Sequence, residues 1–160
     1  MKAWVAKWES AMKTGLKVLA AATLLFNASA WAGPLEEVAE AAAKWGPSYA
    51  EGNLDAFMAP FADNATYTSG LAAFRSEGKG AIRALFATLF HRYPQRQALT
   101  RQIERRAYGD DLVVANAYQD QIYTDKNGSV TTSAVRATAV WARIGGKWQI
   151  VDTHVSKVPH

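Results

Sequence analysis

Cysteine is absent from the 160 residues of the sequence. Disulfides, thiolate nucleophiles and cysteine metal sites are therefore excluded, and the core alone must supply the stability. The three histidines, His91, His154 and His160, are too far apart in sequence to argue for a metal. The sequence also has no glycine-rich phosphate loop, dinucleotide fingerprint or nucleophile elbow, so we expect neither a metal nor a cofactor.

Outside the N-terminal segment, the sequence also lacks a large excess of positive or negative charge. The formal net charge is +4, but residues 1–32 hold four lysines against one glutamate. The 14 basic and 13 acidic side chains of the remainder almost cancel. We therefore expect no nucleic-acid partner, because such a partner requires a concentrated positive charge.

Residues 1–32 have the pattern of a secretory signal peptide. Lys13 and Lys17 precede an apolar run at 18–26, and the small residues Ala30 and Ala32 then suit a signal peptidase. The apolar run is too short to span a bilayer, although an uncleaved N-terminal anchor remains the alternative. We expect a periplasmic or secreted domain over residues 33–160, with no stable membrane insertion after cleavage.

The first half of the mature chain predicts helices. A helix begins at Pro34, and Gly46-Pro47 should kink or restart it. Gly52 suits a helix C-cap, and Asn53 suits the N-cap of the next helix. Apolar residues recur every three or four positions before Pro94, which predicts a third helix.

The second half is rich in β-branched and aromatic residues. Four such segments are separated by turn signals, at 98–108, 111–124, 129–144 and 147–158. Consecutive strands with tight turns predict an antiparallel meander. Helices followed by strands indicate an α+β domain with the helices on one face of the sheet.

Three stretches together resemble the nuclear transport factor 2-like superfamily, in particular its SnoaL-like or SgcJ/EcaC group. They are "EGNLDAFMAPFADNATYTSG" (51–70), "GKGAIRALF" (78–86) and "VWARIGGKWQIVDTHVS" (140–156). The resemblance covers residues 35–158. It implies a cone-shaped α+β barrel, with a curved antiparallel sheet wrapped around three N-terminal helices. It also implies a pocket between helices and sheet, and a homodimer.

Two branches of this superfamily have characteristic polar residues that the sequence lacks. The resemblance to ketosteroid isomerase places Ser69 where that branch has its proton-shuttling aspartate, and Trp45 where it has an oxyanion-binding tyrosine, which argues against isomerisation. The resemblance to the calmodulin-dependent kinase II association domain places its carboxylate-binding arginines near Gln119, Ala139 and Val155. A carboxylate would need another cation here.

His154 is the sharpest candidate for chemistry, because histidine titrates near neutrality and the resemblance puts its strand beside the pocket. Asp152 is two residues away and so shares its strand face, where it could orient the imidazole. The two would form an acid/base pair. Alternatively, His154 is a sheet residue that only satisfies its hydrogen bonds with Thr138, Ser156 or the backbone.

The remaining candidates predict a ligand pocket. Arg136 stands in a strand of alanine, valine and threonine, so it could hold an acidic group or form a salt bridge or dimer contact. Aromatic side chains could line an apolar site or simply form the core. The predicted ligand-binding residues are Trp45, Tyr49, Phe61, Tyr67, Phe86, Phe90, Tyr118, Arg136 and Ser156.

Three functions fit these residues. The first is an exported protein that binds a small apolar or acidic molecule. The second is a SnoaL-like enzyme, an isomerase, cyclase or SgcJ/EcaC-type oxidoreductase, that uses His154 and Asp152. The third is a dimeric interaction module. The sequence leaves open whether any reaction is catalysed.

Overall fold

A computed structural model describes residues 32–159, so the predicted signal peptide lies outside the described residues except for Ala32. The helices are α2 (Pro34–Glu51), α3 (Leu54–Met58) and α4 (Lys79–Arg92). The strands are β1 (Phe61–Ser69), β2 (Ser76–Glu77), β3 (Gln95–Ala107), β4 (Leu112–Thr124), β5 (Val130–Ile144) and β6 (Lys147–Lys157). The predicted α+β class and its three helices are confirmed. None of these three helices has the length and hydropathy needed to cross a bilayer.

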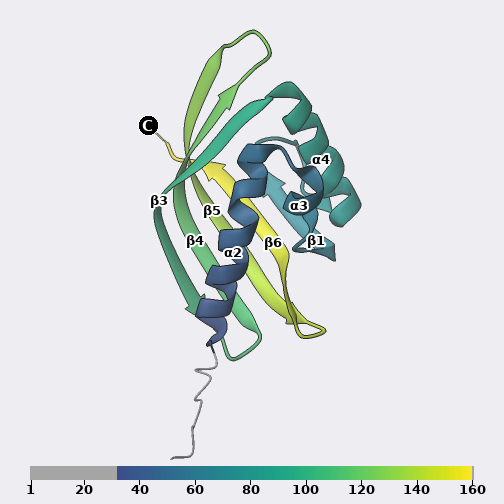
Figure 1. Cartoon of the computed structure of the whole chain (residues 1–160), viewed down its shortest axis with the longest axis vertical. Helices are drawn as coiled ribbons and strands as arrows, with labels where there is room; N and C mark the ends of the chain where they lie inside the picture. Colours follow the sequence, from purple (N-terminus) through teal and green to yellow (C-terminus); the bar gives the residue numbers. More distant parts are fainter. Residues whose placement is uncertain (1–31, 160) are drawn as a thin grey trace, which may run out of the picture. The chain divides into compact units, whose positions relative to one another are not determined.

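The six strands form one sheet in the order β2-β1-β6-β5-β4-β3, with the helices on one face (Figure 1). The predicted meander is confirmed, because β3 to β6 pair antiparallel in sequence order. A wholly antiparallel sheet is wrong, because β1 pairs parallel with β6. The sheet is a cone that does not close into a barrel, since β2 and β3 remain as its edges.

Helix α2 continues through Pro47, so the chain does not restart a new helix at the proline, one of the two outcomes predicted there. Packing on both sides of the proline explains this result. Trp45 donates its indole N–H to the carbonyl of Phe57 at 2.9 Å, and Tyr49 is buried one turn later. Pro47 itself is exposed, so water can reach the carbonyl that the proline leaves without a donor.

The helix ends follow the sequence as predicted. Gly52 is the C-cap of α2 and has a left-handed backbone conformation (φ 77°). This conformation is unfavourable for residues that have a side chain. Asn53 caps α3 by accepting a hydrogen bond from the backbone N–H of Ala56 at 3.0 Å. Together they turn the chain sharply, so that α3 packs against α2.

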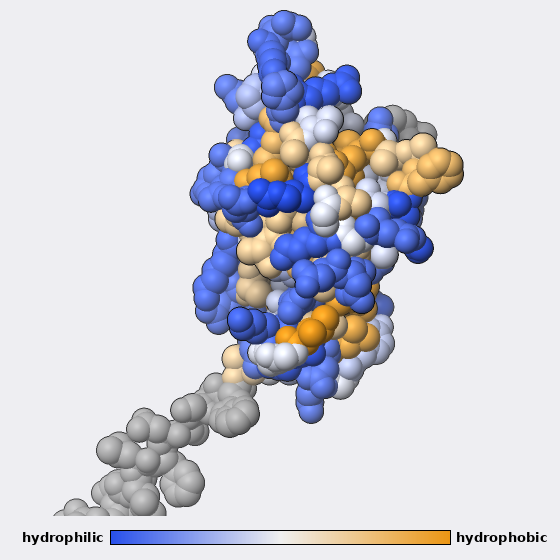
Figure 2. Space-filling model, turned by 90° about the vertical axis from the view of Figure 1, so that its right-hand side faces the viewer, coloured by the Kyte–Doolittle hydropathy of each residue, from blue (hydrophilic) through white to orange (hydrophobic). Residues whose placement is uncertain are grey.

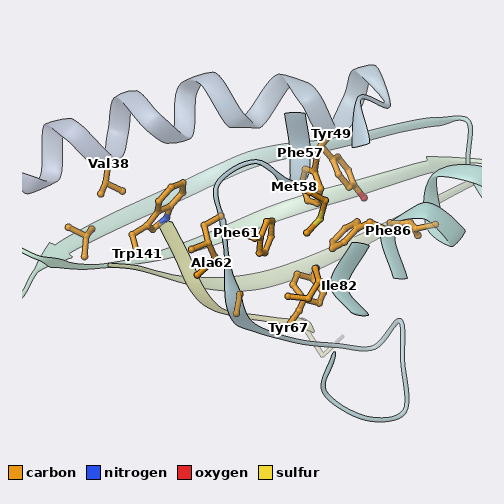
Figure 3. Close-up of a cluster of buried hydrophobic side chains, with 14 of the residues drawn as sticks. Val38, Tyr49, Phe57, Met58, Phe61, Ala62, Tyr67, Ile82, Phe86 and Trp141 are labelled. Carbon is orange, nitrogen blue, oxygen red and sulfur yellow. The ribbon is translucent and has the colours of Figure 1, made fainter. Parts of the chain in front are cut away.

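The core lies between the helices and the sheet (Figure 3). In α4 the buried residues Ile82, Phe86 and Leu89 recur at the predicted helical spacing. Val38 of α2 faces Trp141 of β5, which is 1% exposed. Figure 2 shows, on one side of the molecule, hydrophobic patches among hydrophilic residues and a hydrophilic tip where β4 turns into β5.

Candidate functional site

A cavity of about 250 Å³ separates α2 from the helix-facing side of the sheet. Its floor contains a block of four alanines, because Ala115 pairs with Ala139 and Ala117 pairs with Ala137 on neighbouring strands. Methyl side chains are too short to reach the helix above them. The cavity therefore exists because small residues occupy the inward positions of β4 and β5, where the next inward pair is Val113 and Trp141.

Aromatic rings close the cavity from the helical side. Trp45 is held edge-on against Trp141, with ring centroids 6.0 Å apart, and its indole N–H is already bonded to Phe57. Tyr49 lies next to it along α2, while Phe86 reaches in from α4. Since these rings pack on one another, the apolar walls are rigid and preformed.

Arg105 of β3 brings a cation into this largely apolar wall. Its Nε is buried and has no hydrogen-bond partner within residues 32–159. The adjacent carboxylate, Glu104, is paired with Arg106 instead, at 2.8 Å. A buried guanidinium N–H without an acceptor is costly, so Arg105 is suited to receive an anion from a ligand.

Thr153 is the second unpartnered polar group of the cavity. Its side-chain hydroxyl has no hydrogen bond in the described residues, although the residue is only 6% exposed. Register places Arg105, Ala115, Ala139, Thr153 and Tyr67 in one row across five strands. All five line the cavity. The row thus offers a cation at one end and hydroxyls at the other, with two alanines between them.

Three tyrosines bring phenols to the cavity, namely Tyr49, Tyr67 and Tyr123. Burial raises the pKa of each of them, most strongly for Tyr49 and Tyr67. They therefore stay neutral near pH 7 and serve as hydrogen-bonding groups. Tyr49 donates to the hydroxyl of Tyr123 at 3.2 Å, and Tyr123 donates to Oε1 of Gln121 at 2.8 Å.

The structure brings four of the predicted binding residues to the cavity. These are Trp45, Tyr49, Tyr67 and Phe86. Phe61, at 1% exposure, belongs to the core instead. Phe90 is half-buried and lies under the guanidinium of Arg96, 3.7 Å from the ring centroid. Neither Phe61 nor Phe90 lines the cavity.

Three other predicted binding residues lie together, but on the face of the sheet opposite the cavity. Tyr118 pairs with Arg136, and Arg136 pairs with Ser156. Arg136 donates from Nε to the hydroxyl of Ser156 at 3.3 Å, and Tyr118 is 50% exposed. The inward positions of β4 and β5 are the odd-numbered ones, such as 117 and 137, so 118 and 136 point outward.

His154 and Asp152 also lie on this outer face, where His154 is exposed and Asp152 accepts a hydrogen bond from Thr66. The strand lies beside the cavity, as the resemblance implies, but these two side chains point away from it. The reason is a β-bulge: Trp141 pairs with Ile150, but Val140 pairs with Asp152, so Val151 is an extra residue. After the bulge, Thr153 and Val155 face the cavity. On this face His154 pairs with Thr138, and Ser156 pairs with Arg136.

The resemblance predicted positions that line the cavity, but it did not predict the charged residue there. Gln119, Ala139 and Val155, where arginines were expected and missing, do line the cavity. Arg105 supplies a cation from another strand. The sequence held one signal for it: Arg105 occupies the inward phase of "IERRA", between Ile103 and Ala107, where an apolar residue would be expected.

A model of the calcium/calmodulin dependent protein kinase II association domain matches residues 35–159. A sequence search of curated proteins gives no match. Among solved structures, a Xanthomonas campestris protein assigned to the same association domain family has a TM-score of 0.70 at 23% identity. The alignment covers 78% of this chain and 88% of that one.

Two further structures have the same fold. A Streptomyces avermitilis protein of the nuclear transport factor 2-like family, described as a dehydratase, has a TM-score of 0.70 at 16% identity, covering 79% of this chain and 98% of its own. A superfamily member from Salmonella enterica serovar Typhimurium also has a TM-score of 0.70, at 17% identity, with coverages of 79% and 92%. Identities this low show a common fold and leave activity open.

Proposed function

The chain belongs to the calcium/calmodulin dependent protein kinase II association domain family, and with this premise we propose that it binds a small molecule with an apolar body and an acidic group. The single observation that carries the proposal is the buried, unpartnered Nε of Arg105 in the cavity wall. The rings and alanines around it suit the apolar body.

The size of the cavity limits the ligand. A volume of about 250 Å³ would hold roughly eight waters at liquid density, so the ligand has one or two rings at most. Its flat body would lie between the alanine floor and the rings of Trp45 and Tyr49. Its acid would pair with Arg105, which replaces the missing arginines of the resemblance. We propose binding in preference to turnover, because His154 and Asp152 lie on the other face of the sheet.

The test compares biphenyl-4-carboxylate with its neutral isostere, biphenyl-4-carboxamide, by thermal shift and isothermal titration calorimetry. Binding to the folded state raises the unfolding temperature. We expect the carboxylate to bind and Arg105→Met to weaken it by about 10- to 100-fold, since a hydrogen bond to a charged group contributes about 1.5–3 kcal/mol. The carboxamide should bind weakly to both proteins.

Arg101→Met is the matched control, because Arg101 lies on the same strand but is paired with Asp120. It should bind the carboxylate as the parent protein does. Equal affinity for carboxylate and carboxamide, or equal losses in the two arginine variants, would refute a role of Arg105 in holding an acid.

We also propose that the protein is exported and that the mature chain begins at Gly33. Support comes from the cleavage pattern at Ala30 and Ala32, and from the compact unit, which begins at Ala32. Intact mass of the protein recovered from a periplasmic or culture fraction tests the proposal. The expected mass is that of residues 33–160, whereas an uncut chain in the cell pellet would contradict it.

A homodimer through the outer face of the sheet completes the proposed function. The family is named for association, which supports self-assembly of this chain. Tyr118, half exposed, lies on that face beside Arg136 of β5, and the exposed His154 lies on the neighbouring strand β6. Aromatic and arginine side chains are enriched at protein interfaces.

A further inference from the structure

Arg105 and the hydrogen-bonded tyrosine–glutamine group of the cavity are separated along the sheet, and between them Gln119 already donates its side-chain amide to Thr100. Arg105 lies opposite Ala115 of β4. Gln121, which is bonded to Tyr123, lies six residues farther along the same strand, a distance of about 20 Å between backbone positions. The long arginine side chain and the phenols shorten the gap between the polar atoms. A ligand that reaches both ends must therefore be elongated.

Hydrogen bonds at the tyrosine end leave a defined set of free atoms. Oε1 of Gln121 can only accept, so the hydroxyl of Tyr123 donates to it and in turn accepts from Tyr49. The proton of Tyr49 is thereby used, and its oxygen keeps free acceptor capacity. The amide N–H groups of Gln121, which also lines the cavity, remain as donors.

A group that both donates and accepts satisfies this pair of atoms best. A hydroxyl meets the condition, because it can donate to the oxygen of Tyr49 and accept from the amide of Gln121. A carboxylate has no proton to donate, and the neutral phenols offer it no positive charge. The two ends of the cavity therefore favour different groups.

We propose that the cavity selects elongated hydroxy acids, with the acid at Arg105 and a neutral hydroxyl at Tyr49 and Gln121. This inference rests on the proposed function and narrows its ligand class. The alanine floor and the rings between the two ends leave space for a flat, apolar spacer. An acid without a distal hydroxyl would bind, but it would leave the tyrosine end unmatched.

The experiment uses 4′-hydroxybiphenyl-4-carboxylate and biphenyl-4-carboxylate, which share one spacer and one acid. We expect the hydroxy acid to bind the parent protein about tenfold more tightly by calorimetry. Tyr49→Phe, which keeps the ring and removes the acceptor, should reduce this ratio to about one. Gln121→Met should reduce the ratio in the same way, and it provides the test if Tyr49→Phe does not fold.

Tyr93→Phe is the control, because Tyr93 packs against Tyr123 with centroids 5.0 Å apart but does not line the cavity. It should keep the tenfold ratio. Equal binding of the two acids to the parent protein, or a ratio that persists in Tyr49→Phe and Gln121→Met, overturns the inference alone. Failure of both acids to bind overturns the proposed function together with it.

Discussion

Three buried phenols give single residues a measurable influence on the pH dependence of stability. Burial raises the pKa of Tyr49, Tyr67 and Tyr123 above that of the unfolded chain. Below about pH 10 all are neutral in both states, so their contribution is fully present. Above it the unfolded chain ionises first, and each phenol lowers the free energy of unfolding by about 1.4 kcal/mol per pH unit. Urea titrations between about pH 9 and 11 should show this loss.

Tyr67→Phe is the informative variant, because it removes one phenol and leaves the Tyr49–Tyr123 hydrogen bond intact. The slope of stability against pH should fall by about one third, since three phenols contribute to it. Tyrosinate absorbance from the buried set should appear only as the protein unfolds. An unchanged slope in the variant would show that Tyr67 does not contribute to the alkaline loss.

One residue also separates the predicted site from the observed one. Strand alternation from Ile150 would turn Asp152 and His154 inward, and Val151 as a bulge reverses that phase. Valine is an ordinary strand residue, so nothing local marks the bulge. The cavity aromatics on helices could be predicted, since helical spacing is regular. Cavity residues on β4 and β5 could be predicted only if it was known which face of each strand points inward. The same information was required for Arg105 on β3.

At the scale of elements, the N-terminal turn of α2 is fastened to the β5–β6 hairpin. Glu37 accepts a hydrogen bond from the indole N–H of Trp148 at 2.6 Å and pairs with Arg143 at 2.7 Å. The guanidinium of Arg143 in turn lies over the Trp148 ring, 4.6 Å from its centroid. Glu37→Ala should lower the free energy of unfolding by about 1–3 kcal/mol, because the partly buried indole loses its acceptor and Arg143 keeps only Asp111 as a carboxylate partner. Urea unfolding measures the change.

Glu36→Ala provides the matched control. Glu36 lies in the same first turn, where it interacts with the same helix dipole, but it is exposed. Its loss should change stability by no more than about 0.5 kcal/mol. Similar losses in both variants would attribute the effect of Glu37 to the dipole rather than to Trp148 and Arg143.

Elements with local signals could be predicted from sequence, and those set by distant packing could not. The period of α4, the caps at Gly52 and Asn53 and the turns of the meander are local features. Pro47 is also a local signal, but contacts of Trp45 and Tyr49 outweigh it. The parallel pairing of β1 with β6 joins residues 86 to 89 positions apart in sequence and has no local signature.

At the scale of the whole molecule, the proposed homodimer predicts a concentration-dependent mass. Light scattering after gel filtration should give twice the mass of the mature chain. Tyr118→Glu replaces a half-exposed aromatic ring of the outer face with a charged side chain that the interface would have to desolvate, and we expect it to yield monomers. The affinity for biphenyl-4-carboxylate should not change, because Tyr118 points away from the cavity.

Phe74→Glu is the control for this prediction, since Phe74 is 87% exposed on the loop between β1 and β2, outside the proposed interface. It should remain dimeric. A parent protein that is monomeric at micromolar concentration, or a Tyr118→Glu variant of unchanged mass, would contradict an interface on this face.

The position of β6 has a consequence for synthesis. The last of the six strands in sequence lies inside the sheet, between β1 and β5. A nascent chain that stops before Lys147 has two open strand edges where β6 belongs, and the concave wall lacks Ile150, Thr153 and Val155. The sheet therefore cannot be completed until β6 has been synthesised. A domain that cannot complete its sheet before that point is suited to passage through a translocation channel, as the export that we propose requires.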